Sequence, residues 1–385
     1  MLTTVPEIFT NFRALPDPRR PHANLRHELF EVVVLTLCAT IAGANTWEDV
    51  EVFAKANVDW LRKFLKLNNG VPSHDTIGRI FRMLDTHAFA ACLHEWIEGL
   101  QLNLKGKGVH IDGKVARHSF DAATNKSALH LVSAWCNDLG ISLGQVSTDE
   151  KSNEITAVPE LLELLDIEGA VVTLDALHCQ SKTMAKIRDR QADYLVTVKA
   201  NQKKLLQAIE EAFAKHAEAD YSSSRCRSET TSRKTRGRIE ERTIRVAAVP
   251  RELKDSGKWA DIKSIIMVER HRRPDPSTQS RSPVPETNSV TFLVSSLPAK
   301  VKLISPHVRS HWTVENSLHW SLDVVFAEDA SRIRKGNGQE IIGSLRRLAL
   351  SILKRDTSIR KKSLRQKRLL AGWNIKALES IISAI

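Results

Sequence analysis

The stretch Val109-His-Ile-Asp-Gly-Lys114 decides how the middle of the chain is interpreted, because a short β-branched run ends there in an acidic residue followed by glycine. A second run, Ala170-Val-Val-Thr-Leu-Asp175, ends in an acidic residue in the same way. Runs of this length predict buried strands, and an aspartate at the end of each predicts a carboxylate facing a cleft. Either aspartate alone could simply end a strand or cap a helix. The two together predict a carboxylate pair at one edge of a sheet.

The surrounding pattern predicts the rest of this sheet. Further strands are expected at residues 130–135, 141–146 and 194–198, with helices at 155–165 and 182–190. Three strands joined by short turns, followed by alternating helix and strand, describe a mixed sheet flanked by helices. The fold class is therefore α/β, and the order matches a ribonuclease-H-like core.

The sequence pattern divides the whole chain into four segments. Residues 1–104 read as an all-helical domain, in which Ser73 follows a turn and is expected to be the N-cap of the next helix. The segment Ser73-His-Asp-Thr-Ile-Gly-Arg79 suits either a DNA-reading helix or simple helical packing. Residues 105–221 form the first part of the core. Residues 222–298 read as a β-rich insertion with strands near 238–246, 264–270 and 290–295. Residues 299–385 complete the core and end in a basic helical tail.

Composition points to a folded protein with a polyanionic partner. The 385 residues are 42% hydrophobic and 26% charged, with 57 Lys and Arg against 45 Asp and Glu, which gives a net charge of +12. Residues 331–370 hold thirteen bases and two acids, and residues 225–242 hold seven bases and three acids. The excess charge therefore predicts two basic patches.

The cysteines and the apolar runs bear on compartment. The five cysteines are widely separated and never spaced Cys-x-x-Cys, which argues against a disulfide framework or a zinc ribbon and favours the reducing cytoplasm. The longest apolar run, residues 32–44, is short of the roughly 18 residues that suggest a membrane span. We therefore expect no membrane partner.

A third candidate acid lies in the helix predicted around Glu315. Trp312, Glu315, His319 and Leu322 share one face at steps of three and four, which places Glu315 on the stripe expected to pack inward. A buried carboxylate needs compensation, and a set of Asp, Asp and Glu suits magnesium or manganese. The structural alternative pairs Glu315 with Arg309 or His311 and leaves Trp312 and Trp320 in the core.

Other chemistries lack their motifs. His311, Glu315 and His319 stand at zinc-like steps, but no Cys cluster adds a further ligand and the two aspartates would stay unexplained. The chain has no Gly-x-Ser-x-Gly elbow, P-loop or dinucleotide fingerprint. Two metals held by three carboxylates activate a phosphodiester. Basic side chains near the acids then become expected DNA contacts: Lys114, Arg117, Lys199, Arg332, Arg334 and Lys335.

Ordered motifs along nearly the whole chain resemble the insertion-sequence transposases related to the H-repeat-associated proteins. In the core they are His110–Lys114, Lys151–Ile155, Thr173–Ala176, Asp193–Gln202 and His311–Asp329. In the N-terminal region they are Leu15–Arg19, Cys38–Gly43 and Pro72–Thr76.

The resemblance implies a transposase of the Asp-Asp-Glu type, in which Asp112, Asp175 and Glu315 hold two Mg²⁺ or Mn²⁺ ions. Its partners would be double-stranded DNA, both the element's terminal inverted repeats and the target, and a second copy of the chain in the active complex. It would work in the cytoplasm at the nucleoid, and Asn201 and Gln202 join the expected DNA contacts. Broader relatives carry a Tyr and an Arg before the Glu and a Lys after it, at places that hold Val308, His311 and Leu322 here.

Two other functions remain open from the sequence. The first is a ribonuclease-H-like nuclease that cuts without strand transfer. The second is a catalytically inactive or domesticated copy that only binds DNA through its N-terminal helices and basic tail.

Overall fold

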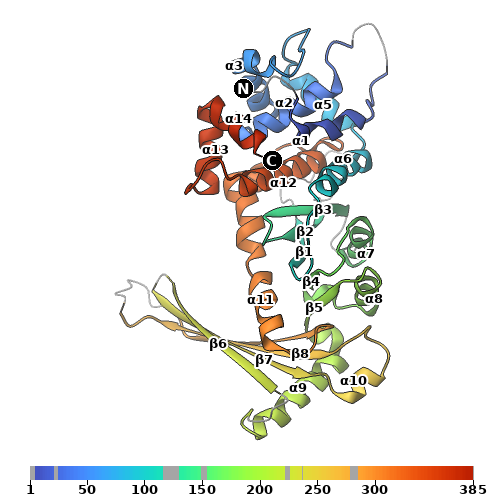
Figure 1. Ribbon diagram of the computed structural model, residues 1–385, viewed down its shortest axis with the longest axis vertical. Coiled ribbons are helices and arrows are strands. Elements are labelled where there is room, and N and C mark those ends of the chain that lie inside the picture. Colours follow the sequence, from blue (N-terminus) through green and yellow to red (C-terminus); the bar gives the residue numbers. More distant parts are fainter. Residues whose placement is uncertain are drawn as a thin grey trace. The chain divides into compact units, whose positions relative to one another are not determined.

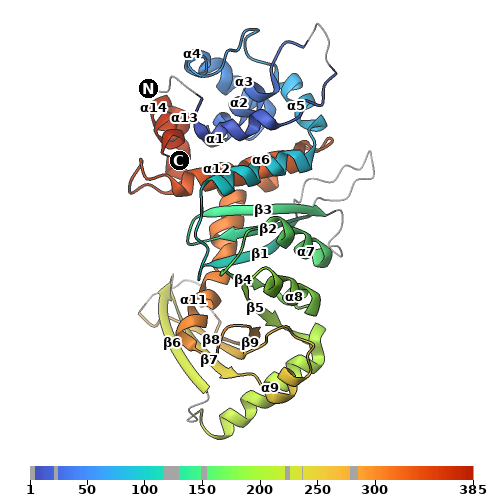
Figure 2. The same ribbon diagram turned by 45° about the vertical axis from the view of Figure 1, so that its right-hand side comes forward.

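Figures 1 and 2 show a computed structural model of the chain, which describes residues 5–20, 25–115, 130–148, 154–221, 226–235, 237–277 and 285–384. By compactness the chain divides into two units. The first unit comprises residues 1–103, 113–165 and 314–385, and the second comprises residues 104–112 and 166–313. Neither unit is a continuous stretch of sequence.

The N-terminal region of the first unit is helical, as predicted. Polar caps begin three of its helices: the side chains of Thr46, Ser73 and Asp85 each accept a hydrogen bond from the backbone N–H three residues on. The expected N-cap at Ser73 is thereby confirmed. The elements are α1 (Glu7–Thr10), η1 (Asn11–Ala14), α2 (Leu29–Ala42), α3 (Trp47–Ala56), α4 (Val58–Leu61), α5 (His74–Met83) and α6 (Thr86–Gly99).

The predicted mixed sheet is present and larger than expected. The strands are β1 (Gly108–Val115), β2 (His130–Cys136), β3 (Ile141–Thr148), β4 (Val171–Leu174), β5 (Asp193–Val198), β6 (Cys226–Thr235), β7 (Arg238–Ala248), β8 (Ser264–Pro274) and β9 (Thr287–Ser295). Their order is β3-β2-β1-β4-β5-β9-β8-β7-β6. β4 pairs in parallel with both β1 and β5. The pairing of β2 with β3 is antiparallel, and so is each successive pairing in the order β5-β9-β8-β7-β6. The first five strands have the order of a ribonuclease-H-like core, which confirms the predicted fold class.

Helices accompany the strands in both units. In the first unit α7 (Glu154–Leu164) packs on β2 and β3. In the second unit α8 (Ser181–Asp189) packs on β5, and α9 (Lys203–Glu218) and the short α10 (Arg251–Asp255) complete the set seen in Figure 1. Short 3-10 turns follow β4 and β5, namely η3 (Ala176–His178) and η4 (Ala200–Gln202).

The four strands β6 to β9 of the β-rich segment continue the sheet of the second unit from β5. Helix α11 (Val301–His311) lies on them, and Ile304 and Val308 join a buried cluster with Leu195, Ile266 and Leu293. The sequence pattern missed β6, whose ten residues are mostly polar. Because β6 is the last strand in the order, only one of its edges pairs, and edge strands tolerate polar side chains.

After α11 the chain enters two π-helical turns, η5 (Glu315–His319) and η6 (Ser321–Val325), and a short η7 (Glu328–Ala330). Here the prediction of an inward stripe is wrong for two of its members. Glu315 is exposed and Trp312 is 37% exposed, whereas Val314, Leu318 and Leu322 are buried. Wider π turns shift the buried positions to steps of four, so the expected 3.6-residue period no longer selects the correct face.

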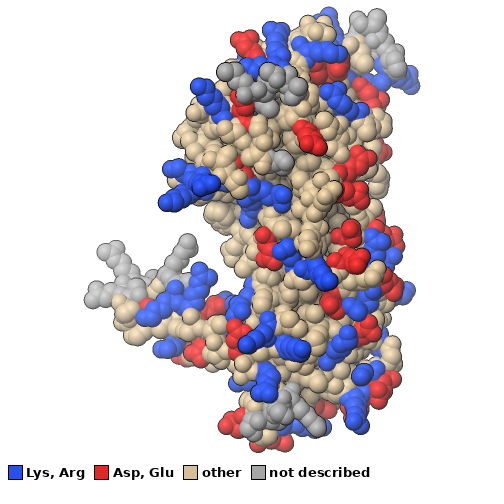
Figure 3. All heavy atoms as spheres, in the orientation of Figure 1, with Lys and Arg blue, Asp and Glu red and all other residues tan. Residues whose placement is uncertain are grey.

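The C-terminal helices are α12 (Gly338–Arg355), α13 (Leu364–Trp373) and α14 (Ile375–Ser383). In the first unit α12 contacts α2, α5, α6 and β3. Four of the bases in this supposedly solvated segment are buried: Arg346, Arg347, Lys367 and Arg368. Figure 3 shows acidic and basic side chains interspersed on the face in view. The C-terminal excess of bases is therefore partly internal structure rather than surface.

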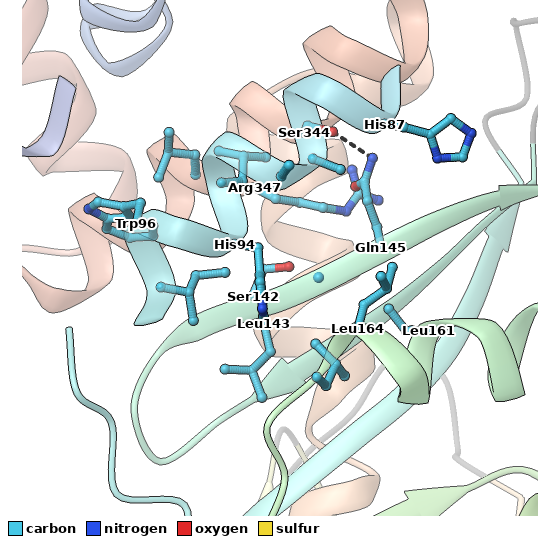
Figure 4. Close-up of a pocket in the computed structure, with 17 residues that line it drawn as sticks. His87, His94, Trp96, Ser142, Leu143, Gln145, Leu161, Leu164, Ser344 and Arg347 are labelled. Atoms are coloured by element: carbon cyan, nitrogen blue, oxygen red, sulfur yellow. Dashed lines mark hydrogen bonds between the residues drawn. The ribbon is translucent and has the colours of Figure 1, made fainter. Parts of the chain in front are cut away.

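A cavity of about 260 Å³ lies in the first unit between α6, β3, α7 and α12 (Figure 4). Its walls are mostly apolar, with Trp96, Leu143 and Leu348 among the lining residues. Gln145 reaches from β3 to donate a hydrogen bond to the hydroxyl of Ser344 at 2.7 Å. The four elements thus leave between them a partly open hollow that their own side chains do not fill.

All five cysteines lie among the described residues; each is buried, and none of them forms a disulfide. No single helix among the described residues combines the length and apolar composition needed to cross a bilayer, and α2 with α3 would do so only jointly across a 94° bend.

Candidate active site

The two predicted aspartates lie where the pairing of β1 with β4 ends, in the second unit. Asp175 follows the last residue of β4 as expected, whereas Asp112 lies inside β1, which continues to Val115. β1 and β4 run in parallel with Ile111 paired to Leu174, and Asp112 and Asp175 each come next along their strands. The pairing of the two parallel strands ends at this point, so Asp112 and Asp175 are neighbouring residues where it ends. The sequence-predicted pair is therefore brought together by the register.

Asp175 is not a helix cap. It precedes η3, but its side chain makes no capping hydrogen bond, and 57% of that side chain is exposed. Its carboxylate instead lies 3.4 Å from Nε2 of His311, the last residue of α11. The hydrogen bond from His311 is the main cause that lowers the pKa of Asp175, with the charges of His311 and Lys199 adding to it. Asp175 is thus held in its ionised form.

Behind Asp175 a polar chain crosses the buried side of these strands. The Thr173 hydroxyl lies 2.8 Å from Nδ1 of His311 and 2.7 Å from Nδ1 of His110, its register partner on β1. Burial lowers the pKa of His110 to about 3, so this ring is neutral. His311 thus faces the Asp175 carboxylate with Nε2 and the Thr173 hydroxyl with Nδ1, and that hydroxyl also faces Nδ1 of His110. The chain fixes how the His311 ring faces the carboxylate.

The loop after Asp175 is braced by residues that follow β5. The side-chain amide of Asn201 donates to the carbonyl of Ala176 at 2.7 Å, and that of Gln202 donates to the carbonyl of Cys179 at 2.8 Å. Asn201 and Gln202 were expected to contact DNA, but these donors are already engaged in holding the loop. Lys199 is exposed and its charge acts on Asp175.

In the first unit, Gly113, the residue after Asp112, packs directly against the buried Glu154. A Cβ on Gly113 would lie 2.8 Å from Cδ of Glu154, the first residue of α7. Glu154 is 6% exposed and lies 3.4 Å from Nδ1 of His130. The Asp-Gly-Lys motif therefore needs its glycine to make room for a carboxylate, a role the sequence analysis did not assign.

Lys114, an expected DNA contact, is instead surrounded by acids of the first unit. Its ammonium contacts the carboxylates of Asp323, Glu328 and Asp329. Glu328 is buried and also accepts from Arg347 at 2.8 Å. Burial alone would raise the pKa of Glu328, but the charges of Arg347 and Lys114 outweigh it and lower the pKa to about 2. The side chain of Lys114 is only 11% exposed. This network ties the segment after Glu315 to β1 and α12.

The third acid, Glu315, opens the π turn η5 in the first unit and is exposed. Its proposed structural partners are used elsewhere: Arg309 pairs with Glu229 at 2.8 Å, and His311 bonds Thr173 and Asp175. Trp320 is 53% exposed and so is not core. Across the described residues, no three His, Cys, Asp or Glu side chains are gathered into a metal site. The pair of aspartates fits a hard cation as a donor set, and the structure does not add the third ligand to it.

The other positions named in the sequence analysis differ in their exposure and placement. Val308 and Leu322, which stand where broader relatives have a Tyr and a Lys, are fully buried. Arg332, Arg334 and Lys335 lie together on the loop before α12. Arg117 falls outside the described residues.

Two family models match consecutive parts of the chain. The family described as "Transposase DDE domain" matches residues 103–352, and its associated N-terminal family matches residues 9–97. The chain is 38% identical over 373 residues to the protein named "Putative transposase YncI" of Escherichia coli O157:H7, covering 96% of this chain and 93% of that protein. It is 35% identical over 382 residues to "H repeat-associated putative transposase YhhI" of Escherichia coli K12, covering 98% of both.

Among solved structures, the chain is similar to a piggyBac transposase in a synaptic complex with hairpin DNA, with a TM-score of 0.42 and 11% identity, covering 98% of this chain and 78% of that one. The aspartate pair on adjacent parallel strands, the family match over 250 residues and the two full-length relatives together identify the chain as a member of the DDE transposase family that includes the H repeat-associated transposases.

Proposed function

We propose that the chain catalyses metal-dependent cleavage and strand transfer of an insertion sequence, with Asp112, Asp175 and Glu315 as the ligands of two Mg²⁺ or Mn²⁺ ions. The observation that carries this proposal is the register of β1 and β4, which makes Asp112 and Asp175 neighbours where the pairing of these strands ends. Hard carboxylate oxygens are the donors that these ions prefer. When bound, two such ions stabilise the attacking and leaving oxygens of a phosphodiester displacement.

The chain's own residues prepare this pair before any metal binds. His311 keeps the carboxylate of Asp175 ionised and oriented, and Asn201 and Gln202 hold the loop behind it. A carboxylate that is already ionised and fixed loses little freedom when it takes up a cation. Glu315 is proposed as the third ligand from its motif and from its exposure.

We also propose double-stranded DNA as the partner, both the terminal inverted repeats of the element and the target. Lys199, Arg332, Arg334 and Lys335 supply the phosphate contacts in this proposal, since Lys114, Asn201 and Gln202 have other partners. The active complex is proposed to contain two copies of the chain and to act at the nucleoid. Light scattering of the purified DNA complex tests the number of copies.

The test of the activity is a plasmid carrying the element's terminal repeats, incubated with the purified protein and Mg²⁺ or Mn²⁺. We expect nicks at the repeat ends and joined products in a target plasmid. Asp112→Asn, Asp175→Asn and Glu315→Gln should each lower the rate by at least about a thousandfold, as loss of a catalytic group commonly does. The exposed Asp189→Asn and Glu95→Gln serve as matched controls.

The outcomes separate the remaining alternatives. Cut ends without joined products would indicate a nuclease that lacks strand transfer. DNA binding without cleavage, together with calorimetric metal binding that does not depend on Asp175 and Glu315, would indicate a relic that only binds DNA. Full activity of Asp112→Asn would refute the assignment of this residue.

A further inference from the structure

A second cavity of the first unit is lined by positive charge. Its volume is about 470 Å³, and it lies between the start of α3, the end of α5 and the loop before α12. The charged residues that line it are Arg82, Arg332, Arg334 and Lys335, with Glu48 as the acid, and Trp47 forms an aromatic wall. We call this cavity the basic pocket. It joins the N-terminal helices to a loop more than 240 residues later in the chain.

The loop is fitted closely to the end of α5. Gly336 has a φ of +57°, and a Cβ there would lie 2.6 Å from the backbone oxygen of Arg82. The backbone N–H of Asn337 donates to that same oxygen at 3.2 Å, and its side-chain amide donates to the carbonyl of Leu84 at 2.8 Å. Only glycine allows this approach. These backbone contacts therefore hold the cations of the loop beside Arg82.

The aromatic wall is equally fixed. Trp47 stacks on Phe81 of α5 with ring centroids 4.9 Å apart, and Gly78 leaves room for the edge of its ring. A Cβ on Gly78 would stand 3.0 Å from Cδ1 of Trp47. The start of α3 is thereby locked against α5, so the pocket keeps its shape without a ligand.

Three of the four cations that line the basic pocket have no ion-pair partner among the residues that the structure describes. Arg82, Arg332 and Lys335 are exposed, and among the described residues none of the three forms an ion pair with a carboxylate. Like charges gathered at one place repel, and an anion relieves that repulsion. Arginine forks match phosphate oxygens in particular. The chemistry of the pocket therefore selects a phosphate.

We infer that the basic pocket binds the backbone phosphates of DNA and is a phosphate clamp separate from the candidate acids. This inference rests on the proposed DNA partner. The pocket is large enough for more than a single small anion.

The first experiment measures binding of a short mixed-sequence DNA duplex by fluorescence anisotropy, in EDTA so that no cleavage occurs. The variant Arg82→Ala/Arg332→Ala/Lys335→Ala should bind at least about tenfold more weakly at about 50 mM salt, and its log affinity should depend less steeply on log salt by about 2 to 3. The control variant Arg62→Ala/Lys63→Ala removes two exposed bases outside the pocket and should change the affinity less than about threefold.

Two further variants separate a shaped pocket from mere net charge. Gly336→Ala keeps every charge but forces the loop away from Arg82, and it should weaken binding at least about threefold. Glu48→Gln removes the lining acid and should strengthen binding by a similar factor. Melting curves establish that each variant is folded.

A third arm distinguishes the source of the phosphate. Inorganic phosphate and ATP are added as competitors of the duplex. The variant Trp47→Phe identifies the part of the protein's tryptophan fluorescence change that comes from the pocket. We expect neither small anion to displace DNA at millimolar concentration. Displacement by ATP at micromolar concentration would overturn the inference in favour of a nucleotide site.

The inference also fails if the triple variant binds DNA like the wild type, or if the control variant loses as much affinity. These results are independent of the cleavage test, because binding is measured without metal. A chain that cuts and joins DNA while its pocket variants bind normally would keep the proposed function and lose the clamp. A chain that never cuts DNA but loses binding through the pocket variants would do the reverse.

Discussion

His311 and Asp175 are joined by a hydrogen bond of 3.4 Å that links the end of α11 to the end of β4, and His311 is itself held by Thr173. The position that carries an arginine in broader relatives thus serves here to orient and ionise a candidate metal ligand. The contact lies wholly within the second unit.

Replacing His311 should release the carboxylate of Asp175. His311 is the main cause of its lowered pKa, so in His311→Ala the pKa of Asp175 should rise toward the usual range of an aspartate. His311→Gln keeps a donor and should retain more of the lowering. A carboxyl NMR titration measures this, and an unchanged midpoint in His311→Ala would contradict the assignment.

Thr173→Val should leave two buried ring nitrogens, on His110 and His311, without their partner. We expect a loss of about 1 to 3 kcal/mol in the free energy of unfolding. Thr173→Ser keeps the hydroxyl and should stay within about 1 kcal/mol of the wild type. Urea unfolding compares the three proteins; a loss in Thr173→Ser as large as that in Thr173→Val would contradict a role specific to the hydroxyl.

Glu328→Gln should destabilise the first unit in a pH-dependent way. The pKa of Glu328 is lowered from 4.5 to about 2, so its ion pairs stabilise the folded chain above about pH 4.5 and are lost as the pH falls through about 2. Near pH 7 the variant should lose about 3 kcal/mol. The difference in melting temperature from the wild type should shrink steadily below pH 4.5. A difference that is constant with pH would argue against the network.

Gly113→Ala should be destabilising because its Cβ would meet Glu154. Overpacking of this kind costs about 1 to 3 kcal/mol. Adding Glu154→Ala should recover part of that loss, so a double-mutant cycle should give a coupling free energy of at least about 0.5 kcal/mol. Additive effects of the two changes would show that the carboxylate does not occupy this space.

Changing the size of the side chains that line the cavity between α6, β3, α7 and α12 should change the free energy of unfolding in both directions. Leu348 is buried in its wall, and Leu348→Ala should cost about 2 to 5 kcal/mol by enlarging the void. Ala90→Leu, on the opposite wall formed by α6, should add about 1 kcal/mol by filling it. Denaturant unfolding measures both, and a destabilised Ala90→Leu would mean that the void is already closed.

The core of the fold was predictable because its strands are short β-branched runs with clear ends. The pairing of Asp112 with Asp175 followed from two such runs, and Ser73 was recognisable as a helix cap. A further signal was available and unused: His110 and Thr173 are polar residues inside apolar runs, and they prove to be register partners. Polar residues at matched depths in neighbouring strands indicate a buried hydrogen-bond chain.

What the sequence could not supply has physical reasons. The predicted inward orientation of Glu315 is wrong because π turns change the period of the helix, and residue propensities do not predict where π turns form. The burial of Arg346 and Arg347 was missed because runs of bases usually face solvent. Their place in the interior depends on Glu328 and on backbone carbonyls that only the fold brings near.

The position of α12 has a consequence for how such a gene decays. Its side chains from Gly338 to Leu353 are nearly all buried, and it contacts both the N-terminal helices and β3. A copy truncated before codon 338 would therefore expose the apolar inner faces of both regions, instead of leaving a folded N-terminal fragment. Such a remnant should be degraded, and it could not compete with an intact copy for DNA.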